Sequence, residues 1–168
     1  EWYDYALYGH MSIIFSQLFF PQGDASKNLI LTLLIFASGF ISRPLGAIFF
    51  GRLGDKFGRK KALTASMMMM AIPTGCIGLL PSYEAIGIAA PILLTLIRIL
   101  QGLSLGGAYS GSISYVVEHA APDQRSTIGS VIKLSLVVGF LFGSLISTIV
   151  ASSLSPEAFY SWGWRLPF

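Results

Sequence analysis

A short basic segment separates two long apolar runs, and it reads Gly51-Arg52-Leu53-Gly54-Asp55-Lys56-Phe57-Gly58-Arg59-Lys60-Lys61. The run before it covers about residues 28–50, and the run after it covers about residues 62–80. Each has roughly the 20 residues that an α-helix needs to cross about 30 Å of hydrocarbon. Two such runs joined by a charged connection indicate a pair of membrane-spanning helices.

Further apolar runs extend this pattern along the chain. We expect spans at about residues 2–20, 28–50, 62–80, 86–117 and 126–154, with a sixth starting at 162–168. Because the runs are long and do not alternate polar with apolar residues, they predict helices rather than barrel strands. The sequence therefore predicts an all-α polytopic membrane protein, with residues 1–168 forming one N-terminal transmembrane bundle.

The overall composition agrees with a membrane protein. Of 168 residues, 54% are apolar and only 11% are charged, whereas soluble domains have about 45–50% and about 25%. This excludes a soluble enzyme, a nucleic-acid-binding module and a disordered tail. Metal-ligand clusters, catalytic triads and phosphate-binding loops are not found in the sequence, so we expect no enzymatic activity, no metal and no cofactor.

The basic residues predict an orientation. Five of them lie in segment 51–61 and Arg125 lies in segment 118–125, whereas the loops on the opposite side hold only Lys27. The positive-inside rule therefore places both basic segments, and with them the chain start, in the cytoplasm.

The two ends of the chain suggest a piece of a longer protein. The sequence begins at Glu1 inside a membrane-like segment and ends where another span starts, at Trp162-Gly163-Trp164-Arg165-Leu166-Pro167-Phe168. Trp162 and Trp164 are expected at the outer interface, where aromatic belts occur.

Arg98 is the clearest ionisable residue inside a span. It lies about 12 residues, or roughly 18 Å, from the outer end of its helix. Two interpretations are open: a structural arginine bound by backbone carbonyls or a buried carboxylate, or a cation that contacts substrate or takes part in coupling. Gln101 and Tyr109 return to the same helix face.

Asp4 is the second candidate, in a stripe with Glu1 and Tyr8 on the first span. A buried carboxylate there could take up and release a proton at physiological pH, and an interfacial helix-end charge is the alternative. Lys133 is expected to extend its side chain to the interface, and His10 to be a packed or hydrogen-bonded helix residue.

Small residues recur at helical spacing in the fourth and fifth spans. Gly102, Gly106 and Gly107 recur in the fourth span, and Gly139 and Gly143 in the fifth. Such spacing allows helix backbones to approach closely.

The motif Gly51-x-Leu53-Gly54-Asp55-Lys56-x-Gly58-Arg59-Lys60 resembles the signature loop of the major facilitator superfamily. Arg98-x-x-Gln101-Gly102 resembles the second motif of that superfamily, in the corresponding span. Segments 1–9 and 43–47 are similar to its metabolite:proton symporter branch, and segments 81–91, 106–111 and 162–168 to the bacterial proline/glycine betaine carriers of that branch.

This resemblance implies a twelve-helix carrier of two six-helix halves, which works by alternating access and is driven by protons. The chain would be the N-terminal half, in the inner membrane of a bacterium, with the C-terminal half as its partner and no nucleic-acid partner. Asp55 would help to close the cytoplasmic side, in a gating loop with Gly51, Gly58, Arg59 and Lys60. Binding or coupling would involve the residues Asp4, Tyr8, Arg98, Gln101 and Tyr109.

One position departs from the branch. Where relatives usually carry Gly-Gly-Glu-Tyr or Gly-Gly-Glu-Trp, this chain has Ala108 in place of the glutamate. We expect proton symport of a small polar metabolite, with a zwitterionic osmolyte such as proline or glycine betaine as the first candidate. A dicarboxylate or citrate-like acid is the alternative substrate, and a non-transporting sensor or structural bundle is the alternative of another class.

Overall fold

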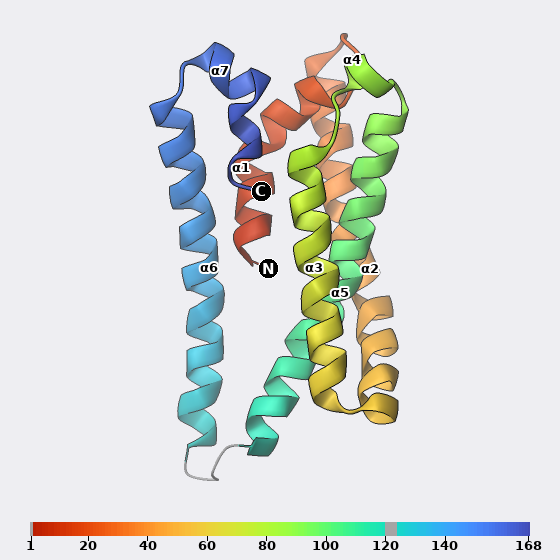
Figure 1. The fold of residues 1–168 in the computed structure, drawn as a ribbon, viewed down its shortest axis with the longest axis vertical. Coiled ribbons are helices and arrows are strands. Elements are labelled where there is room, and N and C mark those ends of the chain that lie inside the picture. The colour runs from red at the N-terminus through yellow and green to blue at the C-terminus, as the bar shows by residue number, and fades with distance from the viewer. Residues whose placement is uncertain (1, 120–123) are drawn as a thin grey trace.

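The computed structural model describes residues 2–119 and 124–168, which form a bundle of long helices with short helices at one end (Figure 1). In chain order the elements are α1 (Trp2–Leu18), α2 (Ala25–Phe57), α3 (Arg59–Leu79), α4 (Tyr83–Ile86), α5 (Ala89–His119), α6 (Arg125–Ser153), α7 (Pro156–Ser161) and the 3-10 helix η1 (Gly163–Arg165). Four helical segments of the described chain are long and apolar enough to cross a membrane, at 25–57, 59–79, 89–113 and 126–153. The predicted all-α class is confirmed.

Segment 51–61 is mostly helical, which corrects the expectation of a loop there. Helix α2 continues to Phe57, and the chain turns at Gly58, whose φ of 93° lies in the region that favours glycine. Helix α3 begins directly afterwards at Arg59. A single glycine therefore makes the connection, and the basic side chains project from two helix ends.

The predicted span at 86–117 is also divided. Gly87, with φ of 57°, separates the single turn of α4 from α5. The positive φ ends α4 at Ile86, and the longer helix starts at Ala89.

Residues 163–165, in the segment where a sixth span is expected to start, form the short 3-10 helix η1. Helix α7 and η1 fold back toward α1 (Figure 1), and the Tyr3 hydroxyl donates a hydrogen bond to the Pro167 carbonyl at 2.6 Å. Trp164, expected at an interface, is buried, while Trp162 is exposed. Trp164 is buried because its ring packs edge-on against Phe15 and Phe19.

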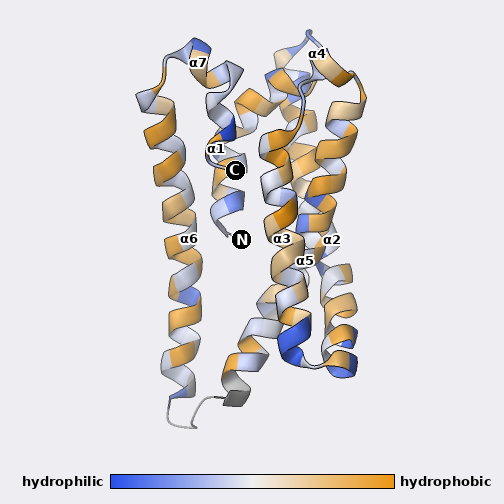
Figure 2. Ribbon diagram, viewed as in Figure 1, coloured by the Kyte–Doolittle hydropathy of each residue, from blue (hydrophilic) through white to orange (hydrophobic). Residues whose placement is uncertain are grey.

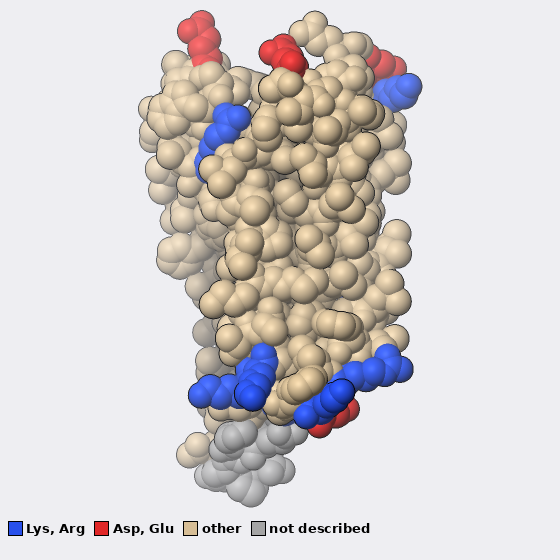
Figure 3. Space-filling model, turned by 45° about the vertical axis from the view of Figure 1, so that its right-hand side comes forward, with Lys and Arg blue, Asp and Glu red and all other residues tan. Residues whose placement is uncertain are grey.

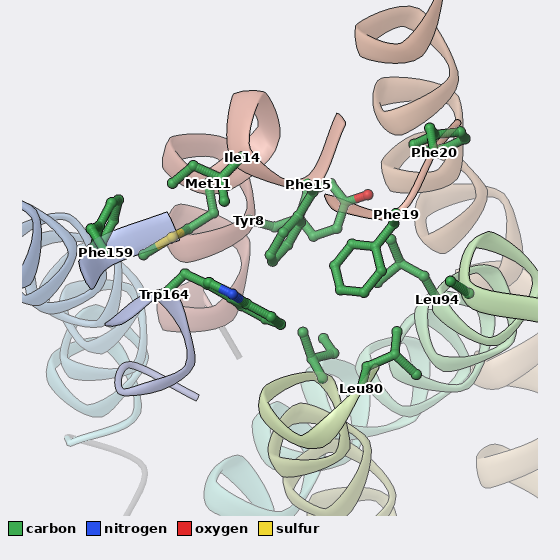
Figure 4. Close-up of a cluster of buried hydrophobic side chains, with 12 residues drawn as sticks. Tyr8, Met11, Ile14, Phe15, Phe19, Phe20, Leu80, Leu94, Phe159 and Trp164 are labelled. Atoms are coloured by element: carbon green, nitrogen blue, oxygen red, sulfur yellow. The ribbon is translucent and has the colours of Figure 1, made fainter. Parts of the chain in front are cut away.

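An aromatic core fills the end of the bundle where α1, α3, α5 and η1 meet (Figure 4). Tyr8 and Phe15 have centroids 5.0 Å apart in an edge-to-face arrangement, a favoured geometry for aromatic pairs. The labelled side chains converge from helices far apart in sequence, so this core fixes α1 relative to α3 and α5.

Helices α2 and α5 lie in direct backbone contact. A Cβ atom at Gly102 would collide with the Gly39 carbonyl and the Ser42 hydroxyl, and one at Gly46 would collide with the Leu103 carbonyl. The Ser42 hydroxyl bridges the same interface, with its oxygen 3.1 Å from the Ile99 carbonyl. The close packing predicted from the small residues of the fourth span is confirmed.

The outer surface is apolar along the helices and charged at the ends. Helix α6 exposes a largely apolar face (Figure 2), which includes Val131, Leu134, Leu141 and Leu145. Most basic side chains gather at the end that carries the α2–α3 connection, and most acidic ones lie at the opposite end beside a few basic ones (Figure 3). This distribution suits a protein whose middle lies in lipid and whose ends meet water.

Candidate functional site

A buried ion pair joins helices α1 and α5. Arg98 Nη1 on α5 donates to Asp4 Oδ2 on α1 at 2.5 Å, and only 2% and 3% of their side-chain surfaces are exposed. Although Asp4 lies in the first turn of α1, it is not an exposed helix-end charge. Since an isolated buried charge is strongly unfavourable, each residue makes the burial of the other possible.

Two neutral side chains extend this pair toward α3. Gln101 Nε2 donates to Thr74 Oγ1 at 2.7 Å. The Thr74 hydroxyl lies 2.9 Å from the Met70 carbonyl and 3.4 Å from Asp4 Oδ1. A hydroxyl carries one proton, so Thr74 donates to one of these two acceptors at a time. The carboxylate therefore has a second partner that can be gained or lost without moving a helix.

Tyr8 covers the guanidinium of Arg98 from one side. The Arg98 Cζ atom lies 3.9 Å from the centroid of the Tyr8 ring, and the Tyr8 hydroxyl donates to the Thr32 carbonyl at 3.0 Å. Arg98 Nε and Nη2 and Gln101 Oε1 are buried without a hydrogen-bond partner among the residues that the structure describes. The cluster consequently retains hydrogen-bonding capacity beyond the ion pair.

A cavity of about 440 Å³ reaches this cluster from between α1, α3, α5 and α6. Asp4 and Thr74 form part of its wall, whereas Arg98 and Gln101 lie behind them. Tyr109 lines the cavity and is partly exposed, so it shares a cavity with Asp4 rather than a contact surface with Arg98. Ala108 lies on the same wall, where a glutamate would have placed a second carboxylate.

The residues of the predicted gating loop lie at the basic end of the bundle. Arg59 Nη2 is 3.1 Å from Asp55 Oδ1, one helical turn away, and both side chains are substantially exposed. Gly54 approaches the Arg59 side chain, Lys60 is exposed, Gly51 lies within α2 and Gly58 makes the turn. An exposed pair of this kind contributes little stability, so its position at the helix junction is its distinctive property.

The remaining sequence candidates are peripheral. Lys133 is exposed on α6, and His10 Nδ1 lies 2.8 Å from the Ala6 carbonyl, as expected for a hydrogen-bonded helix residue. Glu1 lies outside the described residues. Groups of three or more His, Cys, Asp or Glu that could hold a metal do not occur in the part of the chain that the structure describes.

Sequence reasoning did not single out two polar residues that the structure makes prominent. Thr74 contacts the buried cluster, but a threonine in an apolar helix gives no sequence signal of its own. Arg43 on α2 has a guanidinium with buried, unpartnered nitrogens among the described residues. An arginine inside an apolar run is the same signal that identified Arg98, so Arg43 was detectable.

The chain is similar throughout its length to known membrane transporters. It matches the family described as "Sugar (and other) transporter" over residues 1–168. It is 44% identical over 168 residues to the glycine betaine/proline/ectoine/pipecolic acid transporter OusA of Dickeya dadantii, and covers 34% of that protein. It is 43% identical to the inner membrane metabolite transport protein YhjE of Escherichia coli, and covers 38% of it.

Among solved structures, the fold is similar to that of the major facilitator superfamily proton:xylose symporter XylE, with a TM-score of 0.86. The sequence identity is 20%, and the alignment covers 99% of this chain and 38% of that one. The chain thus spans somewhat more than a third of the length of these proteins.

Proposed function

The chain belongs to the sugar (and other) transporter family within the major facilitator superfamily, and from this premise we propose that it is the N-terminal half of a proton-coupled carrier. The carrier would take up a small polar metabolite by alternating access, with a C-terminal helical half completing the path. The bacterial inner membrane is the proposed location, which fits the long apolar helices and a relative named as an inner membrane protein.

The buried pair of Asp4 and Arg98 is the observation that carries the proton-coupling part of this proposal. Asp4 reaches the cavity wall, so a proton can approach its carboxylate from that side, while Arg98 pairs with the carboxylate from behind. Protonation of Asp4 removes the charge that Arg98 binds and weakens the link between α1 and α5. Uptake of a proton would thereby change how firmly two helices of the bundle are joined.

A zwitterionic osmolyte such as proline or glycine betaine is the proposed substrate class. Support comes from relatives that are 40–44% identical and named as transporters of these compounds. An organic acid is the second candidate, because Arg98 retains buried nitrogens without partners in the described chain and could attract an anion. The two candidate substrates differ in net charge, and uptake assays with compounds of each kind distinguish them.

The helix junction around Asp55 and Arg59 is the proposed cytoplasmic gate. Its exposed carboxylate and guanidinium are available to contact another helical half when the cytoplasmic side closes. Proton coupling and gating would then lie in different parts of the bundle, joined by the long helices α2 and α3.

The test is uptake of labelled glycine betaine, L-proline and citrate by the full-length carrier in bacteria that lack osmolyte uptake. We expect accumulation of the zwitterions that a protonophore abolishes, with alkalinisation of the medium when substrate is added. Asp4→Asn should abolish accumulation driven by the proton gradient but leave exchange of labelled for unlabelled substrate. Glu84→Gln, which changes an exposed carboxylate in the same way, is the matched control and should behave as wild type.

Three outcomes would contradict the proposal. Proton-driven accumulation that persists in Asp4→Asn would remove Asp4 from coupling. Accumulation of citrate without the zwitterions would favour the organic acid. Absence of transport for all three compounds in a correctly inserted protein would favour the sensor or structural bundle.

A further inference from the structure

Arg43 on α2 is a charged side chain for which the described part of the chain supplies aromatic rings but no counter-charge. Its Cζ atom lies 4.0 Å from the centroid of the Phe40 ring and 4.8 Å from that of Tyr5. The Nε and Nη2 atoms are buried and have no hydrogen-bond partner among the residues described. The rings hold the guanidinium in place, and its Nε and Nη2 donors have no partner in the described chain.

Arg43 is a half-buried charge within an apolar stretch of α2. The residue lies about 18 positions into α2, or roughly 27 Å from its outer end, within the apolar part of the helix. Charges at such depths are normally paired or face a functional cavity. Asp4, the buried carboxylate of the described chain, is already bound to Arg98. The Nε and Nη2 donors of Arg43 are therefore available to a group from outside this set.

A cavity of about 550 Å³ opens beside Arg43 between α1, α2 and α5. Its lining includes Arg43 and three aromatic residues, Trp2, Phe40 and Tyr109. This volume is within the range of small-molecule sites. It is a different cavity from the one that reaches Asp4, although Trp2 and Tyr109 contribute to both.

The two kinds of lining group recognise opposite charges. A guanidinium donates paired hydrogen bonds to a carboxylate, and aromatic faces attract ammonium groups, quaternary ones in particular. A ligand that carries both charges on a short frame would satisfy the two at once. A simple anion would leave the aromatic rings without a cationic partner, and a simple cation would be repelled by Arg43.

We propose that this cavity binds a zwitterionic substrate, with its carboxylate on Arg43 and its ammonium group against Trp2 and Tyr109. The inference rests on the proposed transport function and separates two roles within it. Arg43 binds substrate, whereas the pair of Asp4 and Arg98 responds to protons. Arg98 then does not need to contact substrate, a role that the sequence alone gave as one of two interpretations.

Equilibrium binding to the purified full-length carrier, without a proton gradient, tests this site. The probes are glycine betaine and choline, which share a trimethylammonium group while only glycine betaine has a carboxylate. Arg43→Gln should raise the Kd for glycine betaine about tenfold or more, since charge-assisted hydrogen bonds are lost, without weakening choline. Arg43→Lys should bind glycine betaine with intermediate affinity, because it keeps the charge but not the planar fork. Arg52→Gln, an exposed arginine on the same helix, is the matched control.

A second variant keeps the test decisive if Arg43→Gln does not yield folded protein. Tyr109→Leu should raise the Kd for glycine betaine and for choline alike, by roughly three- to thirtyfold. Unchanged Kd values in Tyr109→Leu, or an unchanged Kd for glycine betaine in Arg43→Gln, would overturn the site. Equal weakening of both ligands in Arg43→Gln would also overturn it, because the carboxylate contact would then be absent.

Failure of this inference is distinguishable from failure of the proposed function. If coupling is wrong but the site is right, Arg43→Gln loses affinity while Asp4→Asn transports as wild type. If the site is wrong but coupling is right, proton-driven uptake depends on Asp4 while binding is indifferent to Arg43.

Discussion

At the scale of single residues, a charge inside this bundle is best understood through the partner that it has or lacks. Arg98 and Asp4 neutralise each other at 2.5 Å, out of contact with solvent. Arg43 instead lies on aromatic rings, with nitrogens that the described chain leaves unpaired. In the proposed carrier, the first arrangement would break when a proton arrives, and the second would be completed by a substrate carboxylate. The two arginines thus differ in burial and in partners, and we propose different tasks for them on that basis.

The coupling between Asp4 and Arg98 predicts strong non-additivity. Asp4→Asn or Arg98→Gln alone should lower the free energy of unfolding of the full-length carrier by about 3–5 kcal/mol, because either change leaves an uncompensated buried charge. The double variant should lose much less than the sum, since no charge remains. Unfolding in mixed detergent micelles measures the cycle.

The exposed pair of Asp55 and Arg59 provides the control for this cycle. It has the same residue types with substantial solvent exposure, so Asp55→Asn and Arg59→Gln should each change stability by at most about 1 kcal/mol. Additive losses in the buried pair would show that the two residues do not stabilise each other, and would contradict the structural account.

The candidate site was only partly predictable at this scale. Asp4 and Arg98 stand out in sequence because ionisable residues are rare in apolar runs. Their pairing across 94 positions depends on how α1 and α5 pack, and the spacing of residues in the sequence does not reveal that packing. Thr74 illustrates the other limit, since its hydroxyl matters only because α3 brings it between Gln101 and Asp4.

At the scale of elements, glycine determines how closely α2 and α5 approach. Gly102→Ala should lower the free energy of unfolding by about 1–3 kcal/mol, because the new Cβ meets the backbone of Gly39, which cannot rotate away as a side chain can. Gly75→Ala on α3 is the matched control, since nothing lies within 4 Å of its Cβ position. That change should be neutral or slightly stabilising. Equal effects at the two sites, measured by the same unfolding assay, would show that the α2–α5 contact tolerates extra volume.

The helical type of the apolar runs was predictable, but several of the helix ends were not. An apolar run marks where a helix lies in lipid, not where it stops. Helix α2 has 33 residues, or about 50 Å, which exceeds the roughly 30 Å of hydrocarbon. Its basic end therefore continues as helix beyond the apolar run until Gly58 turns the chain. The burial of Trp164 was not predictable either, because it depends on Phe15 and Phe19 in a distant helix.

At the scale of the whole molecule, the charge distribution predicts how the bundle lies in the membrane. One end exposes the five basic residues of segment 51–61 together with Asp55, and the opposite end carries Asp24, Glu84 and Glu157 with Lys27 and Arg165 (Figure 3). Because short loops rich in Lys and Arg stay on the cytoplasmic side, the α2–α3 junction should face the cytoplasm. The start of α7 should then face the outside.

Cysteine labelling in intact cells tests this orientation. The exposed Cys76 is first replaced by serine, and single cysteines are then introduced by Lys60→Cys and Glu157→Cys, both at exposed positions. A membrane-impermeant maleimide should label Glu157→Cys directly and Lys60→Cys only after permeabilisation. A membrane-permeant maleimide should label both without permeabilisation, which shows that both thiols are reactive. The reverse pattern would place the basic junction outside. Asp55 and Arg59 could then not act as a cytoplasmic gate, and a proton entering from outside would approach Asp4 from the opposite end of the bundle.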